Sequence, residues 1–178
     1  MKTLKYLLAF FLLSASVIGQ NLNSIDAMFV IDNSGSMKKN DSGFLLNKTL
    51  TMFVQNQQDD TDIGFILFSD KVDVFIPLIP LKVDTAKSSL KKIINYINYS
   101  GKYTNSPSAI EKAYYELKTN GRKGCDKIII FLTDGIVDLE NYAKNDEKSR
   151  WLKEVIADDC KTERIRIFSI AFTEQADF

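Results

Sequence analysis

Two short segments of this sequence carry oxygen-bearing side chains directly after apolar runs. Residues 32–36 read Asp-Asn-Ser-Gly-Ser, and residues 133–135 read Thr-Asp-Gly. Carboxylates and hydroxyls are hard ligands, which suit Mg²⁺, Mn²⁺ or Ca²⁺ and not soft metals. A carboxylate that closes a buried strand is costly to place beside another unless a cation lies between them. We therefore expect a divalent-cation site that includes Asp32, Ser34, Ser36 and Asp134.

The composition excludes several other kinds of site. The chain of 178 residues has no histidine, which excludes Ser-His and Cys-His catalytic pairs and histidine-ligated zinc. Two cysteines alone cannot complete a tetrahedral zinc site. The 23 basic and 23 acidic residues cancel, so no net charge favours nucleic acid or an anionic membrane surface as the partner.

Apolar runs rich in β-branched and aromatic residues predict five strands, at residues 25–32, 63–68, 72–77, 127–133 and 165–172. Only three residues separate the second run from the third, which predicts a hairpin and an antiparallel edge strand. The other runs alternate with helical patterns, which favours a parallel sheet. We predict an α/β fold with a Rossmann-like, doubly wound, mostly parallel sheet, helices on both faces and strand order 3-2-1-4-5. In such a sheet, ligands bind at the carboxyl ends of the strands, where the order reverses.

The helices are predicted from apolar residues at helical spacing, within residues 46–54, 90–97, 110–117 and 151–156. The third of them has the clearest start, because Ser106 can cap a helix whose first residue is Pro107. Gly121 is expected to end this helix.

The two acidic segments together resemble a known family. Asp-x-Ser-x-Ser after the first strand is the pattern of the metal-ion-dependent adhesion site of von Willebrand factor type A domains, and the strand-ending Thr-Asp-Gly supplies that site's last ligand. The family adds a threonine in the pattern Thr-x-x-x-x-Ala, which residues 104–109 match. The resemblance implies hydroxyl ligands from Ser34, Ser36 and Thr104, and carboxylates from Asp32 and Asp134 that bind directly or through water. It extends over residues 25–172, and the family's last helix or strand is expected to be missing.

The resemblance implies a function outside the cell, as a metal-dependent protein-binding or adhesion domain that is not an enzyme. The cation, expected to be Mg²⁺, would coordinate a Glu or Asp carboxylate of a protein partner. The charges agree with this, because only two carboxylates balance the cation and leave it electrophilic. Two alternatives stay open. One is a metal-dependent hydrolase or phosphatase on a similar sheet, although Ser34 interrupts the Asp-x-Asp pattern of aspartate phosphatases. The other is a structural assembly module of a larger surface protein.

The first residues predict export. A short basic stretch, an apolar run and small residues before a cleavage point indicate a signal peptide over residues 1–19, followed by a domain over residues 20–178. We expect a secreted or cell-surface protein, periplasmic in a bacterium, with no membrane span after cleavage. Export permits disulfides, so we expect a bond between Cys125 and Cys160. Glycosylation patterns begin at Asn40, Asn47 and Asn98, and the first and last are the better acceptors in a eukaryote.

Overall fold

A computed structural model describes residues 24–41, 43–56, 60–81, 84–135 and 137–172 of the chain. The expected signal peptide over residues 1–19 lies outside the described residues. No helix in the part that is described is long and apolar enough to cross a membrane.

The centre of the molecule is a five-stranded sheet with the order β3-β2-β1-β4-β5, as the sequence predicts. The strand β1 pairs in parallel with β2 and β4, β4 pairs in parallel with β5, and β3 is the antiparallel edge strand beside β2. The strands are β1 (Ile25–Asp32), β2 (Thr61–Phe68), β3 (Val72–Pro80), β4 (Asp126–Thr133) and β5 (Ile165–Ala171).

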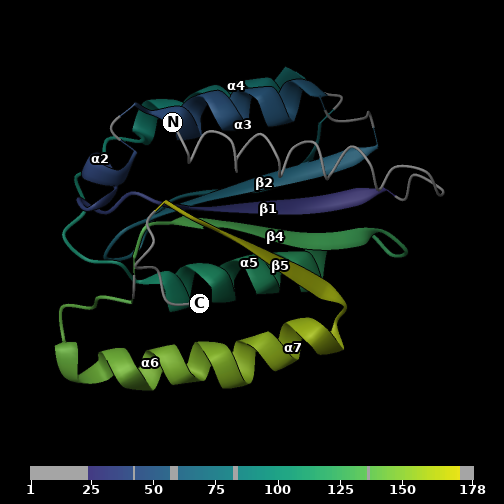
Figure 1. Cartoon of the computed structure of the whole chain (residues 1–178). Helices are drawn as coiled ribbons and strands as arrows, with labels where there is room; N and C mark the ends of the chain where they lie inside the picture. The colour runs from purple at the N-terminus through teal and green to yellow at the C-terminus, as the bar shows by residue number, and fades with distance from the viewer. Residues whose placement is uncertain (1–23, 42, 57–59, 82–83, 136, 173–178) are drawn as a thin grey trace.

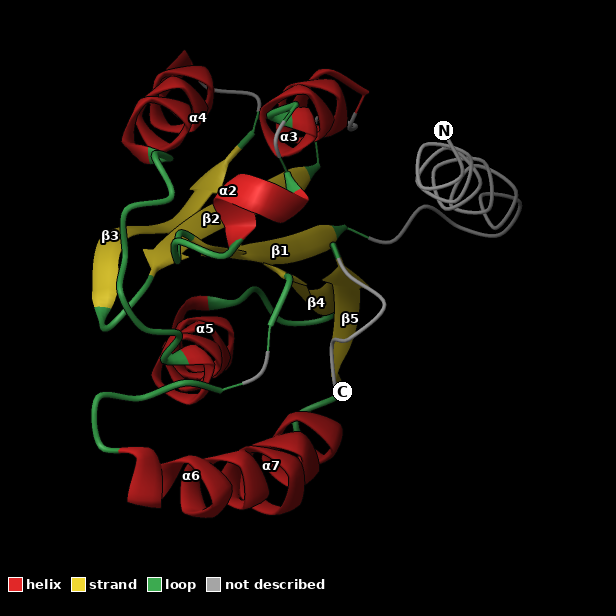
Figure 2. Cartoon of the chain, turned by 60° about the vertical axis from the view of Figure 1, so that its left-hand side comes forward, coloured by secondary structure: helices red, strands yellow, loops and turns green. Residues whose placement is uncertain are grey.

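Helices cover both faces of the sheet, so the predicted fold class is confirmed (Figures 1 and 2). One face carries α3 (Leu45–Asn56) and α4 (Asp84–Tyr96), and the other carries α5 (Ser106–Asn120) and a long helical segment near the C-terminus. That segment comprises the 3₁₀ turn η1 (Tyr142–Lys144), α6 (Asn145–Trp151), the π-helical stretch η2 (Leu152–Ile156) and α7 (Ala157–Thr162). A single turn, α2 (Met37–Asn40), follows β1 at one end of the sheet.

The core consists of two apolar layers that share β1. Alternate residues of a strand point to opposite faces, so Phe29 lies on the face of α3 and α4 while Met28 lies on the face of α5. Phe29 stacks on Phe65 of β2, with ring centroids 5.3 Å apart. Burying each such side chain stabilises the folded state by about 1.5–3 kcal/mol. Both faces of β1 are therefore covered by apolar side chains.

The amino end of β1 is fastened by one arginine. Arg122, in the turn after α5, donates from Nε to Asp26 Oδ1 at 2.7 Å and from its guanidinium to the carbonyl of Ile25 at 2.9 Å. Asp26 is fully buried, whereas the second acidic partner, Asp60, is 70% exposed. This end of the sheet is opposite the end where the candidate ligands gather.

The expected disulfide is not formed, because Cys125 and Cys160 are both free. Cys160 lies within α7, which continues to Thr162 before β5 begins. Its side chain packs into the apolar layer on the α5 face and is 2% exposed. Cys125 lies in the turn before β4 and is partly exposed. Burial raises the pKa of the Cys160 thiol to about 11.

Candidate functional site

The acidic segments meet at the carboxyl end of the sheet. The neighbouring strands β1 and β4 are in parallel register, with Ile31 beside Leu132, so Asp32 and Thr133 follow at the same edge. The hydroxyl of Thr133 donates to Asp32 Oδ2 at 2.6 Å, which ties the two strand ends together. The switch in strand order between β1 and β4 is therefore where the oxygen-bearing side chains gather, as expected.

Asp32 is the most deeply placed member of the site. Its side chain is fully buried, and Oδ1 accepts the backbone N–H of Ser34 at 2.8 Å. Burial raises the pKa of Asp32, the hydrogen bonds from Thr133 and Ser34 oppose that rise, and the nearby charge of Asp134 adds to it. In the described parts of the chain, neither carboxylate has an ion-pair partner.

A chain of hydroxyls joins the first loop to the second carboxylate. The hydroxyls of Ser34 and Ser36 are 3.1 Å apart, and Ser36 donates to Asp134 Oδ1 at 2.9 Å. The other oxygen of Asp134 accepts from the amide of Asn40, at 2.6 Å. Asn40 was noticed in the sequence only as a glycosylation pattern. Nothing in its spacing reveals this contact, because the single turn of α2 is what brings the amide back to the site.

Thr104 lies on a separate loop that runs beside the first one. Gly101 of this loop forms a parallel bridge with Ser34, and the N–H of Gly35 donates to its carbonyl at 2.8 Å. Thr104 follows three residues later, is 5% exposed, and exchanges two backbone hydrogen bonds with Asp138. The structure thus joins Asp32, Ser34, Ser36 and Asp134 through contiguous hydrogen bonds and places Thr104 on the adjacent loop.

The helix after this loop begins differently from the sequence prediction. The N-cap of α5 is Asn105, whose side chain accepts from the N–H of Ser108, so Ser106 is already the first helical residue. Gly121 ends the helix, as expected. The shift moves the cap one residue closer to Thr104 and leaves Ser106 buried.

A second buried carboxylate supports the first loop from the side of α3. Asp41 is 2% exposed and accepts the N–H of Leu45 at 2.8 Å, which caps the start of α3. It also accepts the hydroxyl of Tyr99, a residue of the Thr104 loop. Burial, and then Asp41, raise the pKa of Tyr99, so its hydroxyl remains a donor at all ordinary pH values.

The side chains of this site fit a hard divalent cation. The donors are two carboxylates and the hydroxyls of serine and threonine, all oxygens, with no thiol or imidazole. Two facing carboxylates without a cationic side chain leave an uncompensated negative charge, which a divalent ion would neutralise. Across the described residues, no three His, Cys, Asp or Glu side chains gather as a metal site, and the present site combines only two carboxylates with hydroxyls.

Comparison with known proteins gives the same fold. The family model described as the von Willebrand factor type A domain matches residues 26–178. Among curated proteins, none matches this chain. The solved structures that it resembles include the pilus adhesin SpaC from Lactobacillus rhamnosus GG, at 22% identity and a TM-score of 0.54, over 66% of this chain and 16% of the adhesin. Others are BatB from Bacteroides thetaiotaomicron (19% identity, TM-score 0.58, 83% of this chain and 66% of that one) and a von Willebrand factor type A protein from Catenulispora acidiphila (13%, 0.60, 83% and 32%). At these identities the likeness concerns the fold alone.

Proposed function

Because this chain belongs to the von Willebrand factor type A family, we propose that it is a non-enzymatic binding module that holds a divalent cation, Mg²⁺ by expectation, and through it a carboxylate of a protein partner. One observation carries the proposal. Asp32 and Asp134 are joined through Ser34 and Ser36 at a strand-order switch, by the backbone N–H of Ser34 and by the two serine hydroxyls, and neither carboxylate has a cationic partner in the described residues.

Each residue has a distinct role in this proposal. Ser34, Ser36 and Thr104 would offer neutral hydroxyl oxygens, and Asp32 and Asp134 would supply the charge, directly or through water. The bound cation would supply a Lewis-acidic centre that attracts an outside anion. Asn40 already donates to Asp134, and so it would keep that carboxylate oriented whether or not the ion is present.

The partner and the place of action follow from the same reasoning. A cation balanced by two carboxylates has only neutral ligands left, so a further carboxylate is the natural occupant of an open position. Proteins with this fold include a pilus adhesin and the type V pili tip protein Mfa5 from Porphyromonas gingivalis, which supports adhesion as the biological setting. We therefore propose that the domain binds a protein outside the cell or at its surface.

Calorimetric titration with Mn²⁺ and Mg²⁺ tests the metal site. We expect binding to one site by the wild type and its loss in Asp32→Ala, while the circular dichroism spectrum stays unchanged because removing a buried carboxylate relieves its desolvation. Asp126→Ala is the matched control, since this carboxylate is 45% exposed and pairs with Arg166 at the opposite end of the sheet. Undiminished metal binding in Asp32→Ala would overturn the site.

A capture experiment tests the partner. Protein from the extracellular medium should be retained on the immobilised domain in Mg²⁺ and released by a chelator. Retention that does not change with the chelator, or turnover of a phosphate ester by the domain, would contradict a cation-mediated binding function.

A further inference from the structure

The loop that carries Thr104 has a complete set of backbone N–H hydrogen bonds. Every N–H from Asn98 to Asn105 donates to an acceptor of the chain. Asn33 Oδ1 accepts from residues 98 and 99, Asn98 Oδ1 from residue 100, and the carbonyl of Asn33 from residue 101. Asp70 Oδ1 accepts from residues 102 and 103, and the carbonyls of Asp138 and Ser69 accept from residues 104 and 105. Two side chains, those of Asn33 and Asp70, therefore hold four of these eight groups.

Asn33 holds the first half of the loop. Its Oδ1 accepts from the N–H of Asn98 at 3.0 Å and of Tyr99 at 2.8 Å, and its Nδ2 donates to Asn98 Oδ1 at 3.3 Å. Asn33 is 5% exposed, so water competes little for these bonds. Tyr99 has a φ of 53°, a left-handed conformation that is unfavourable for a bulky residue. The bonds from Asn33 and the buried Tyr99 hydroxyl offset that strain.

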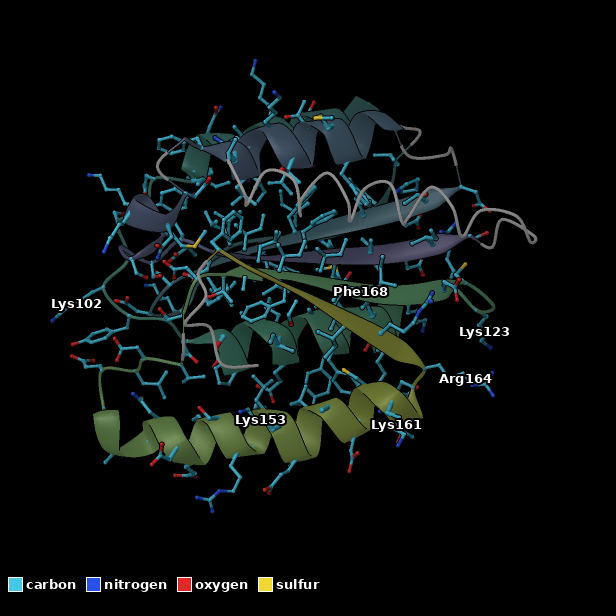
Figure 3. The ribbon with its side chains drawn as sticks, viewed as in Figure 1. Lys102, Lys123, Lys153, Lys161, Arg164 and Phe168 are labelled. Atoms are coloured by element: carbon cyan, nitrogen blue, oxygen red, sulfur yellow. The ribbon has the colours of Figure 1, made fainter. Side chains whose placement is uncertain are left out.

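Asp70 holds the second half of the loop from the other side. Its Oδ1 accepts from the N–H of Lys102 at 3.1 Å and of Tyr103 at 2.8 Å, and its carbonyl accepts from the side chain of Asn105 at 3.2 Å. Asp70 follows β2, and Lys102 projects from the same end of the sheet, with its ammonium pointing away from the protein (Figure 3). The loop is therefore fastened to the ends of both β1 and β2.

Thr104 lies directly after these fastened residues, and its own N–H and carbonyl are both bonded to Asp138. The side-chain hydroxyl of Thr104 is therefore the polar group of this residue that can serve as a ligand at the cation site. We propose that Asn33 and Asp70 are positioning residues, which hold the loop of residues 98–105 in place so that the hydroxyl of Thr104 is set for the cation before the cation binds. The inference rests on the proposed function, and it adds two residues that the ligand patterns of Asp-x-Ser-x-Ser, Thr-x-x-x-x-Ala and Thr-Asp-Gly do not specify.

Amide hydrogen exchange of the metal-free protein, followed by NMR, tests whether Asn33 and Asp70 hold the loop in the absence of any ligand. In Asn33→Ala the amides of Asn98 and Tyr99 should exchange about 10-fold faster, the effect of one ordinary hydrogen bond. In Asp70→Ala the amides of Lys102 and Tyr103 should do so, whereas Asp70→Asn, which keeps the acceptor oxygen, should restore protection. Unchanged exchange rates at all four amides would show that Asn33 and Asp70 do not hold the loop.

Mn²⁺ affinity then tests whether Asn33 affects the cation site through Thr104. We expect Asn33→Ala to weaken Mn²⁺ binding about 10-fold, as outer-shell substitutions do at other metal sites. If Asn33 acts through Thr104, the double variant with Thr104→Ala should bind no more weakly than Thr104→Ala alone. Effects that multiply in the double variant, or an unchanged affinity in Asn33→Ala, would overturn the positioning role.

Glu116→Ala is the matched control for general destabilisation. Glu116 is a buried side chain that also accepts a backbone N–H, that of Leu78 in β3, and it takes no part in the loop. This variant should be less stable but should keep wild-type Mn²⁺ affinity. If the wild type itself binds no Mn²⁺, the proposed function fails, and the positioning role fails with it. If the wild type binds Mn²⁺ and only the coupling is absent, the positioning role alone fails.

Discussion

Replacing Arg122 by alanine should destabilise the domain more than any substitution of an exposed charge. Arg122 is the only cationic group that the described residues bring to Asp26, which is 0% exposed, and the two lie 2.7 Å apart. Breaking a buried pair by removing one partner costs about 3–5 kcal/mol, because the remaining charge is left uncompensated.

The expected cost lies at the lower end of that range. The backbone N–H of residue 122 also donates to Asp26, at 2.5 Å, and the alanine variant keeps this bond. Of the two other ion pairs, the one with Asp60 adds little because Asp60 is 70% exposed, and the one with Asp62 is longer, at 3.5 Å. We therefore expect a loss of about 3 kcal/mol, which at a urea m-value of about 2 kcal/mol/M lowers the midpoint of unfolding by about 1.5 M.

Urea denaturation followed by circular dichroism provides the measurement, and two further variants sharpen it. Asp26→Asn in the Arg122→Ala background should recover part of the loss, because it removes the uncompensated charge. Arg166→Ala is the control, since its partner Asp126 and Arg166 itself are 45% and 57% exposed, and it should cost less than about 0.5 kcal/mol. A cost for Arg122→Ala equal to that of the control, or no recovery in the double variant, would refute the reasoning.

Three further outcomes are expected. Gly64→Ala should cost about 1–3 kcal/mol in urea unfolding, because the new Cβ would lie 2.4 Å from Met28 Sδ; a stability equal to wild type would show that β2 shifts freely. Asn40→Ala should weaken Mn²⁺ binding in calorimetry by about 10-fold, since the amide no longer orients the carboxylate at the end of β4, and full affinity would exclude that role. Iodoacetamide at pH 8 should alkylate Cys125 quickly and Cys160 slowly, because burial raises the pKa of the Cys160 thiol to about 11. Mass spectrometry after unfolding should find both cysteines alkylated. Two cysteines that stay unreactive in the unfolded protein would show that the disulfide is formed.

Much of the fold could be predicted from the sequence because the central strands β1, β2 and β4 are long, apolar and largely buried. The burial of β1 between two helical layers requires an almost unbroken apolar run, and only three residues between β2 and β3 leave no room for a crossover. Parallel strands end at one edge, so two runs that close in Asp32 and Asp134 could be placed together from sequence alone. The pattern of hydroxyls around them suggested a cation for the same reason.

The contacts between loops had to come from the tertiary structure. Asn33 and Asp70 hold backbone groups more than 30 residues away, and Asn40 reaches a carboxylate 94 residues away, so no local spacing signals them. The free cysteines are another case, because Cys160 lies within α7 and its side chain packs into the apolar layer on the α5 face. Sequence thus determined which residue types gather at the end of the sheet, since strand burial dictates where each strand ends. Only the tertiary structure shows which polar side chains orient these candidate ligands. A hydrogen bond depends on distances that the paths of several loops determine together.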